Sequence, residues 1–280
     1  MSVTNRIILS DNGTLTDVSK EVLRYQSGTA AVASWVAAED YLYVGSLAPF
    51  NHFYVKLATA SVTTSNVMTV QYWDGKTWVD CHKVDDETAG FTTSGYVTFY
   101  PDRNTAWVRE STNDRGDSVT GLTSTKIYDM YWVRIKFSLN IGAGFTLSWM
   151  GQKFSDDSDL AAEMPRLTRS SMLSAFITGK TDWEEQHVKA GELIVQDLIA
   201  GQVMDWAGQI LVREEFTLAS VYKVAQIIFS ELGDDYLDQH DRAEREYKRR
   251  LDKSVYRVDK NQDGLLNQNE GNARVGFMSR

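Results

Sequence analysis

The hydrophobic pattern changes its period part-way along this 280-residue chain. In residues 1–160 apolar and polar side chains alternate, which is typical of strands with one buried face. Beyond about residue 165 the apolar side chains recur every three to four positions, as in helices that bury one stripe. The sequence therefore predicts an α+β protein with a β-rich part followed by a helical part.

The β-rich part carries several short alternating segments separated by turns that contain glycine. Asp74-Gly75 separates two such segments and is a hairpin signal. Later, Val133, Ile135 and Phe137 share one strand face, while the opposite face is mixed. Several strands of this kind within about 130 residues predict an antiparallel β-sandwich.

Three helices are expected in the second part, over residues 187–201, 216–232 and 236–258. The first two carry broad apolar stripes, and Gly233 is a stop signal after the second. The third is highly charged, and its narrow apolar seam consists of Tyr247, Leu251, Val255 and Val258.

The polar stretch from residue 153 to residue 171, which contains one proline, is the expected domain boundary. We therefore expect a β-sandwich over residues 1–160, a helical domain over residues 161–258, and a loop-like segment with a C-terminal tail over residues 259–280.

Charge and composition exclude some classes of protein. The formal charge of −9 argues against a nucleic-acid groove, which needs a surplus of Lys and Arg. The negative charge is compatible with a channel wall past which DNA slides without binding. Apolar runs are too short for a membrane span, and the first residues are too polar for a signal peptide. With Cys81 as the single cysteine, no internal disulfide is expected, and we expect folding in cytoplasm.

Catalytic patterns are weak. Cys81 and His82 are adjacent, so on a strand they point to opposite faces. The other histidines have no metal-site spacing, and the glycine motifs of nucleotide sites and serine hydrolases do not occur. The acidic runs at residues 85–87 and 156–157 are typical of solvated loops. We expect no enzyme, because a hydrolase would require acidic or histidine side chains converging in a cleft.

Aromatic side chains leave one alternative open. Tryptophans at positions 73, 78, 107 and 132 lie on strand segments. Exposed, coplanar rings would form a carbohydrate- or receptor-binding surface, whereas a sandwich core also uses aromatics. The placement of these rings on faces shared with Val, Ile and Phe favours the core.

The stretch DKNQDGLLNQNE resembles the calcium-binding loop of EF-hands. Gly264 falls at the sharp turn of that loop. The absence of a second loop, and the ten residues after Glu270, predict a structural Ca²⁺ site and not a sensor. An Asx- and glycine-rich turn is the alternative. The expected ligands are Asp259, Asn261, Asp263, the carbonyl of Leu265, Asn267 and Glu270.

A family resemblance covers residues 170–258, about a third of the chain. The stretches SSMLSAFITGKTDWEEQHVKAGELIVQDLIAG, ILVREEFTLASVYKVAQIIFSEL and HDRAEREYKRRLDKSVYRV, the last with an AxxEYxxxL pattern, resemble head–tail adaptor (connector, or head-completion) proteins of tailed bacteriophages. In the first part, YWDGKTW and YWVRIKFS resemble decoration domains in baseplate and neck proteins.

The resemblance implies a structural virion protein that assembles in the host cytoplasm and resides at the neck. Such adaptors form a ring, commonly twelve-fold, beneath the portal protein. They extend the DNA channel, let DNA pass without sequence-specific binding, and present a surface to tail or other neck proteins. The large N-terminal domain departs from small adaptors, so the partner of that domain stays open.

Overall fold

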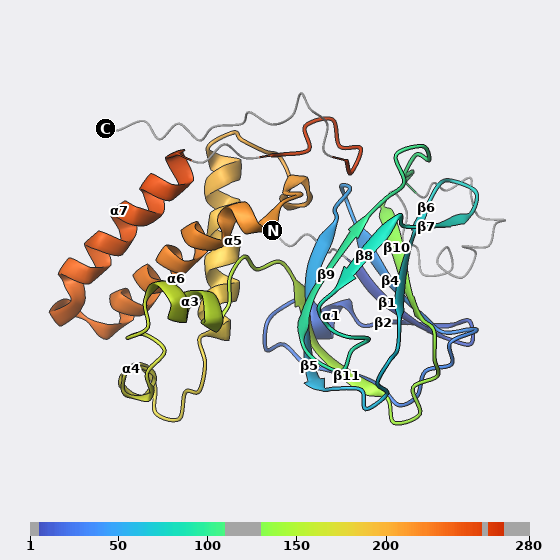
Figure 1. The fold of residues 1–280 in the computed structure, drawn as a ribbon, viewed down its shortest axis with the longest axis horizontal. Helices are drawn as coiled ribbons and strands as arrows, with labels where there is room; N and C mark the ends of the chain where they lie inside the picture. Colours follow the sequence, from blue (N-terminus) through green and yellow to red (C-terminus); the bar gives the residue numbers. More distant parts are fainter. Residues whose placement is uncertain (1–5, 110–129, 254–256, 266–280) are drawn as a thin grey trace. The chain divides into compact units, whose positions relative to one another are not determined.

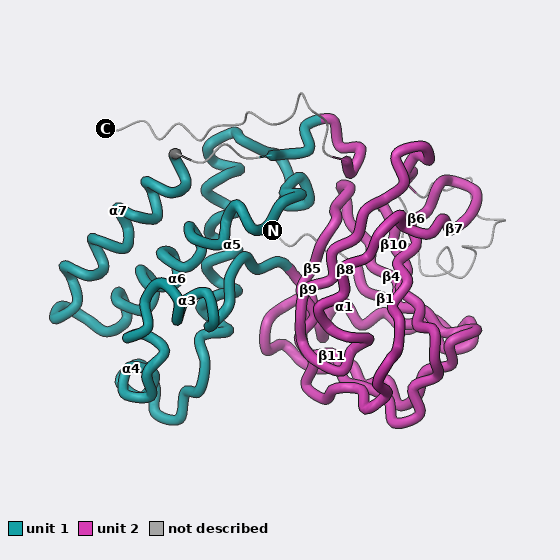
Figure 2. Tube along the Cα trace, in the orientation of Figure 1, with its two compact units in different colours: residues 1, 152–260, 266–280 teal, residues 2–151, 261–265 magenta. Residues whose placement is uncertain are grey.

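The computed structural model describes residues 6–109, 130–253 and 257–265 (Figure 1). These residues form two compact units (Figure 2). The helical unit is Gln152–Lys260, and the β unit is residues 6–151 together with Asn261–Leu265. The expected α+β class, with an N-terminal sandwich and C-terminal helices, is confirmed.

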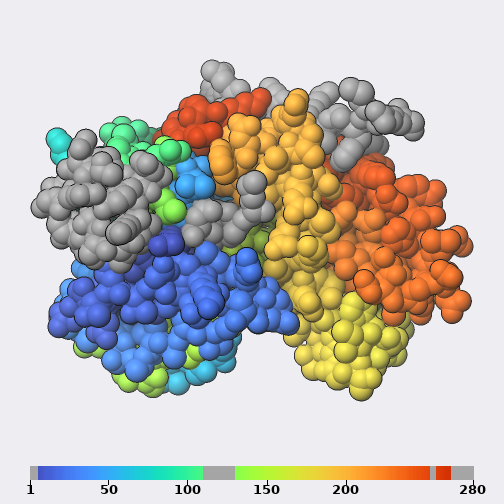
Figure 3. Space-filling view, turned by 180° about the vertical axis from the view of Figure 1, so that it is seen from behind, coloured from blue at the N-terminus to red at the C-terminus, as the bar shows by residue number. Residues whose placement is uncertain are grey.

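Two antiparallel sheets build the β unit. The first has the order β2 (Thr14–Asp17), β1 (Arg6–Asp11), β4 (Tyr41–Ser46), β10 (Tyr131–Phe137), β6 (Met68–Trp73) and β7 (Trp78–Asp80). The second has the order β3 (Ala30–Val32), β11 (Phe145–Gly151), β5 (His52–Thr59), β9 (Gly95–Tyr100) and β8 (Lys83–Asp86). A short helix, α1 (Ser19–Val22), follows β2. In a space-filling view, residues from β1 to β4 give this unit a continuous surface (Figure 3, blue).

Strand register explains the core of the sandwich. Ile7, Val44, Val133 and Tyr72 lie side by side across four strands of the first sheet, and all are buried. The Tyr72 ring packs against Trp107, whose own ring packs against phenylalanines that include one from β9. Alternation thus places one face of each sheet in a shared aromatic core.

The predicted hairpin is also present, since β6 pairs with β7 around residues 74–77. Asp74 Oδ1 accepts hydrogen bonds from the backbone N–H groups of Lys76 and Thr77, at 2.7 and 2.6 Å. Gly75 has a φ of +97°, a left-handed conformation that glycine adopts at little cost.

The helical unit contains α3 (Asp157–Glu163), α4 (Ser170–Phe176), α5 (Glu184–Ala200), α6 (Thr217–Leu232) and α7 (Leu237–Lys253). Helix α6 packs against both α5 and α7, and its buried stripe of Val221, Val224, Ala225 and Ile228 forms the centre of the core. Gly191 lets α5 lie close to the backbone of residues 152–153, because a Cβ there would lie 3.0 Å from the Gln152 carbonyl oxygen.

The third expected helix is shorter than predicted. Tyr247 and Leu251 are buried as expected, but Val258 is not helical and forms a β-bridge with Ile210. Its place in the predicted helical seam is therefore wrong, because backbone pairing to the α5–α6 connection replaces helical hydrogen bonds there. Val255 lies outside the described residues. None of the helices in the described ranges is long and apolar enough to cross a membrane.

Candidate functional site

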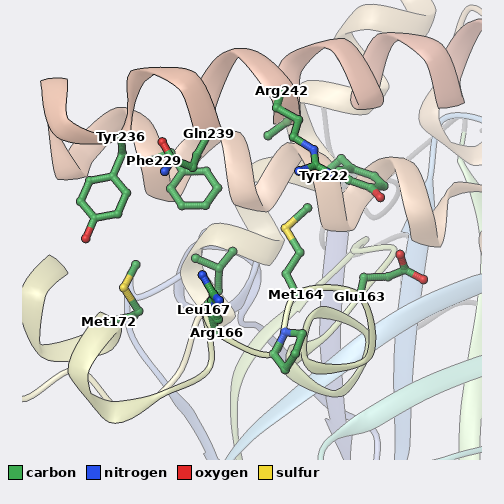
Figure 4. A pocket seen from close by; sticks show the side chains of 12 residues that line it. Glu163, Met164, Arg166, Leu167, Met172, Tyr222, Phe229, Tyr236, Gln239 and Arg242 are labelled. Carbon is green, nitrogen blue, oxygen red and sulfur yellow. The ribbon is translucent and has the colours of Figure 1, made fainter.

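The helical unit contains a groove with a volume of about 530 Å³ (Figure 4). We call it the helical groove. One wall comes from the α3–α4 connection and α4, and the other from α6, α7 and the turn between them. A volume of this size is within the range of about 300–1,000 Å³ typical of ligand sites. Its apolar lining includes Met164, Leu167, Met172, Tyr222, Phe229 and Tyr236.

Local sequence fixes both walls of the helical groove. Gly233, at a φ of +86°, ends α6 and lets the chain reverse towards α7. The reversal stacks Tyr236 on Phe229, with ring centroids 5.9 Å apart and an interplanar angle of 15°. On the other wall, the buried Trp183 donates its indole N–H to the Leu167 carbonyl at 2.9 Å. The groove is therefore held open by packed, hydrogen-bonded walls.

The rim of the helical groove is charged. Arg166 and Arg242 are exposed, and neither makes an ion pair with another residue in the described part of the chain. Glu163 and Gln239 complete the polar lining. An apolar floor beside two guanidinium groups that make no ion pair among the described residues suits aliphatic or aromatic side chains accompanied by a carboxylate.

A second cluster joins residues that no spacing pattern in the sequence connects. Ser155 Oγ lies 2.8 Å from His187 Nδ1 and 2.7 Å from Ser220 Oγ, while His187 Nε2 lies 3.2 Å from Asp157 Oδ1. Serine, histidine and aspartate are the side chains of many hydrolases. The sequence signals were single polar residues on apolar helix stripes, together with an acidic pair that we expected to be solvated.

Access argues against catalysis by this cluster. Ser155, His187 and Ser220 are completely buried, so a substrate does not reach the serine oxygen. The hydrogen bonds instead satisfy polar groups inside the helical unit and tie the segment before α3 to α5 and α6. We assign the cluster a structural role.

The predicted calcium ligands fall into three groups. Asp259 belongs to the helical unit and is buried. Its backbone N–H donates to the Gln209 carbonyl at 2.9 Å, and its own carbonyl accepts from Gln209 Nε2 at 2.7 Å. Asn261, Asp263 and Leu265 belong to the β unit. Asn267 and Glu270 lie outside the described residues.

The described part of the loop has the turn that a calcium loop needs. Gly264 has a φ of +78°, and a Cβ there would lie 3.2 Å from Trp107 and 3.3 Å from Pro49. Asp263 Oδ1 accepts the backbone N–H of Leu265 at 2.8 Å, and its Oδ2 accepts the side-chain amide of Asn261 at 3.0 Å. The conformation and the oxygen donors fit calcium chemistry. Ca²⁺ binding stays a prediction.

Another group of metal-ligand side chains lies on α7, where donor atoms of His240, Asp241 and Glu244 fall within 4.8 Å of one another. Sequence reasoning missed it because these residues match no known motif. Glu244 already pairs with Lys248 at 2.5 Å, and this hydrogen bond lowers the pKa of the Glu244 carboxyl. A cation would have to displace the lysine, so we assign no metal to this group.

The four tryptophans do not form an exposed platform, and Trp107 lies after β9 and not on a strand as expected. Trp73, Trp78, Trp107 and Trp132 are all buried in the described β unit. On the outer face of the first sheet, the Arg134 guanidinium lies 4.8 Å from the Trp78 ring centroid, within a packed cluster. The exposed coplanar rings that a sugar-binding surface requires are not found at these four positions.

Comparisons with known proteins leave the family open. No family model matches the chain, and no curated protein matches it. Among solved structures, one match is a family 89 glycoside hydrolase from Clostridium perfringens in complex with 2-acetamido-1,2-dideoxynojirmycin, with 9% sequence identity and a TM-score of 0.30. It covers 71% of this chain, which spans 20% of that chain. Similarity at this level carries no argument about fold or activity.

Proposed function

We propose that the protein is a structural virion protein of the phage neck that forms a ring beneath the portal protein and joins head to tail. The observation that carries the proposal is the helical groove, because its apolar floor and two arginines without an ion pair among the described residues form a surface suited to another protein chain. The helical unit already has its own buried core, so the groove is additional apolar surface.

Charge and construction agree with this role. A formal charge of −9 suits a wall along which DNA passes without adhering. The buried Ser155–His187 pair rigidifies the helical unit and offers a substrate no entry. In this proposal the protein is not an enzyme. It contacts the portal, tail or other neck proteins, and other copies of itself, commonly in a twelve-fold ring.

A structural Ca²⁺ at the loop of residues 259–270 is part of the same proposal. The ion would fix the direction in which the C-terminal segment leaves its turn. Asn261 and Asp263 supply oxygen donors, and Gly264 supplies the left-handed turn.

Light scattering coupled to gel filtration, with negative-stain imaging, tests the proposal. The purified protein is measured alone and with the portal protein encoded in the same genome. We expect closed rings in at least one of these samples, and a ring seated on the portal. A protein that stays monomeric in both samples and does not bind the portal would overturn the proposed function.

A further inference from the structure

Two exposed aliphatic side chains on the β unit provide an apolar counterpart to the helical groove. Val67 and Leu139 are 63% and 44% exposed. Val67 lies in the connection between β5 and β6, and Leu139 lies in the one between β10 and β11. We call these two residues the aliphatic tip.

The two connections are fastened together by hydrogen bonds. Val67 donates its backbone N–H to Ser138 Oγ at 2.9 Å, and its carbonyl accepts the Ser138 N–H at 3.0 Å. Asn66 Oδ1 accepts the backbone N–H of Leu139 at 3.0 Å. The two residues of the tip are therefore held at fixed positions with their apolar side chains exposed to water.

A carboxylate belongs to the same end of the β unit. Asn140, next to Leu139, accepts the backbone N–H of Ala37 at 2.8 Å through its side chain. The turn that begins at Val36 also contains the exposed Glu39, whose N–H donates to the Val36 carbonyl. The tip thus combines apolar side chains with a nearby negative charge, and the helical groove combines an apolar floor with Arg166 and Arg242.

We propose that the aliphatic tip of one copy of this chain occupies the helical groove of another copy. This inference rests on the proposed ring, and it names the contact that builds it. One chain carries both complementary surfaces, apolar against apolar and carboxylate against guanidinium. Because the two surfaces differ, the contact is heterologous, and repetition produces a ring when the rotation closes.

Two variants separate the surfaces. The tip variant is Val67→Asp with Leu139→Asp, which places charges where the groove is apolar. The groove variant is Arg166→Glu with Arg242→Glu, which reverses the sign of these two charges on the rim of the groove. All four positions are exposed or on the rim, so the fold should survive, and circular dichroism checks this. Matched controls are Val108→Asp, another exposed valine of the β unit, and Arg169→Glu, an exposed arginine that does not line the groove.

Mass measurements on each variant and on their mixture test the contact. We expect each variant to associate at least tenfold more weakly than wild type, and both controls to assemble normally. In an equimolar mixture, the intact tip of the groove variant can occupy the intact groove of the tip variant. No other intact pair of surfaces remains, so the mixture should give heterodimers and nothing larger. A contact between two tips or between two grooves predicts no heterodimer, and that outcome would overturn the proposal.

Crosslinking gives a second measurement that does not depend on weakening the contact. In a Cys81→Ser background, Val67→Cys protein mixed with Gln239→Cys protein should form a covalent heterodimer with a short bifunctional maleimide. Gln239 lines the groove and is exposed. If both surface variants still formed rings like those of wild type and this crosslink did not form, the tip-in-groove contact would be rejected, but the proposed ring would not. Wild type that forms no ring, alone or with portal, would reject the proposed function itself.

Discussion

Lys153 and Glu184 provide a quantitative test of how the helical unit is held together. Lys153 Nζ lies 2.9 and 3.1 Å from the two carboxylate oxygens of Glu184, and the side chains are 1% and 17% exposed. Removing one partner of a buried pair costs about 3–5 kcal/mol, because the remaining charge stays buried without its counter-charge. Since Glu184 keeps some contact with water and the Asp156 carboxylate also interacts with the Lys153 ammonium, we expect the lower end, about 3 kcal/mol, for Glu184→Gln.

Urea unfolding followed by far-ultraviolet circular dichroism measures this loss, because the helices dominate that signal. With a slope of about 2 kcal/mol per molar urea, a loss of about 3 kcal/mol lowers the midpoint by about 1.5 M. The double variant Lys153→Met with Glu184→Gln should lose less than Glu184→Gln alone, since no ammonium then remains buried.

Glu185→Gln is the matched control. Glu185 lies in the same first turn of α5 and is exposed, so it shares the interaction with the helix dipole but not the contact with Lys153. We expect this change to cost less than about 1 kcal/mol. If Glu184→Gln lowered the free energy of unfolding no more than Glu185→Gln, the buried Lys153–Glu184 pair would not stabilise the helical unit.

Three further predictions concern single sites. Glu270→Gln should weaken Ca²⁺ binding in isothermal titration at least tenfold, because it removes a charged ligand, and equal binding by wild type and variant would count against a genuine site. Ser155→Ala should lower stability by about 1–3 kcal/mol in the same urea assay, because His187 Nδ1 and Ser220 Oγ lose a buried partner, and an unchanged midpoint would contradict this. Burial raises the pKa of the Cys81 thiol, so the reactive thiolate forms only at a pH above the ordinary thiol range. Alkylation of the folded protein at neutral pH should therefore be slower than in urea, where the pKa returns to normal, and equal rates would refute the shift.

The change from strands to helices was predictable because hydrophobic period is a local property. Alternation at Val133, Ile135 and Phe137 identified β10, and all three side chains are buried. The order of strands was not predictable in this way. β10 lies between β4 and β6 through pairings distant in sequence, and no local pattern encodes them.

The same distinction applies to the candidate sites. The loop of Asn261, Asp263 and Gly264 was identified because its residues are consecutive, and its turn has the expected left-handed glycine. The helical groove could not be identified from the sequence, because Met164 and Tyr236 are brought to facing walls only by packing of α3, α6 and α7. The third helix shows the limit of periodicity, since Val258 continued the apolar seam but pairs with Ile210 in an extended bridge.

Both surfaces of the proposed contact are ordered before they meet. Stacking of Tyr236 on Phe229, and the indole hydrogen bond of Trp183, fix the groove. Side chains of Asn66 and Ser138 fix the tip. Association loses affinity when loops and side chains must be ordered on binding, at about 0.5–1.5 kcal/mol for each immobilised side chain. A small contact repeated around a ring avoids much of this cost when both surfaces are rigid, and closure then adds one more contact without a further loss of translational freedom. The structural cluster at Ser155 and His187 is consistent with the same requirement, because a rigid helical unit keeps the groove in shape.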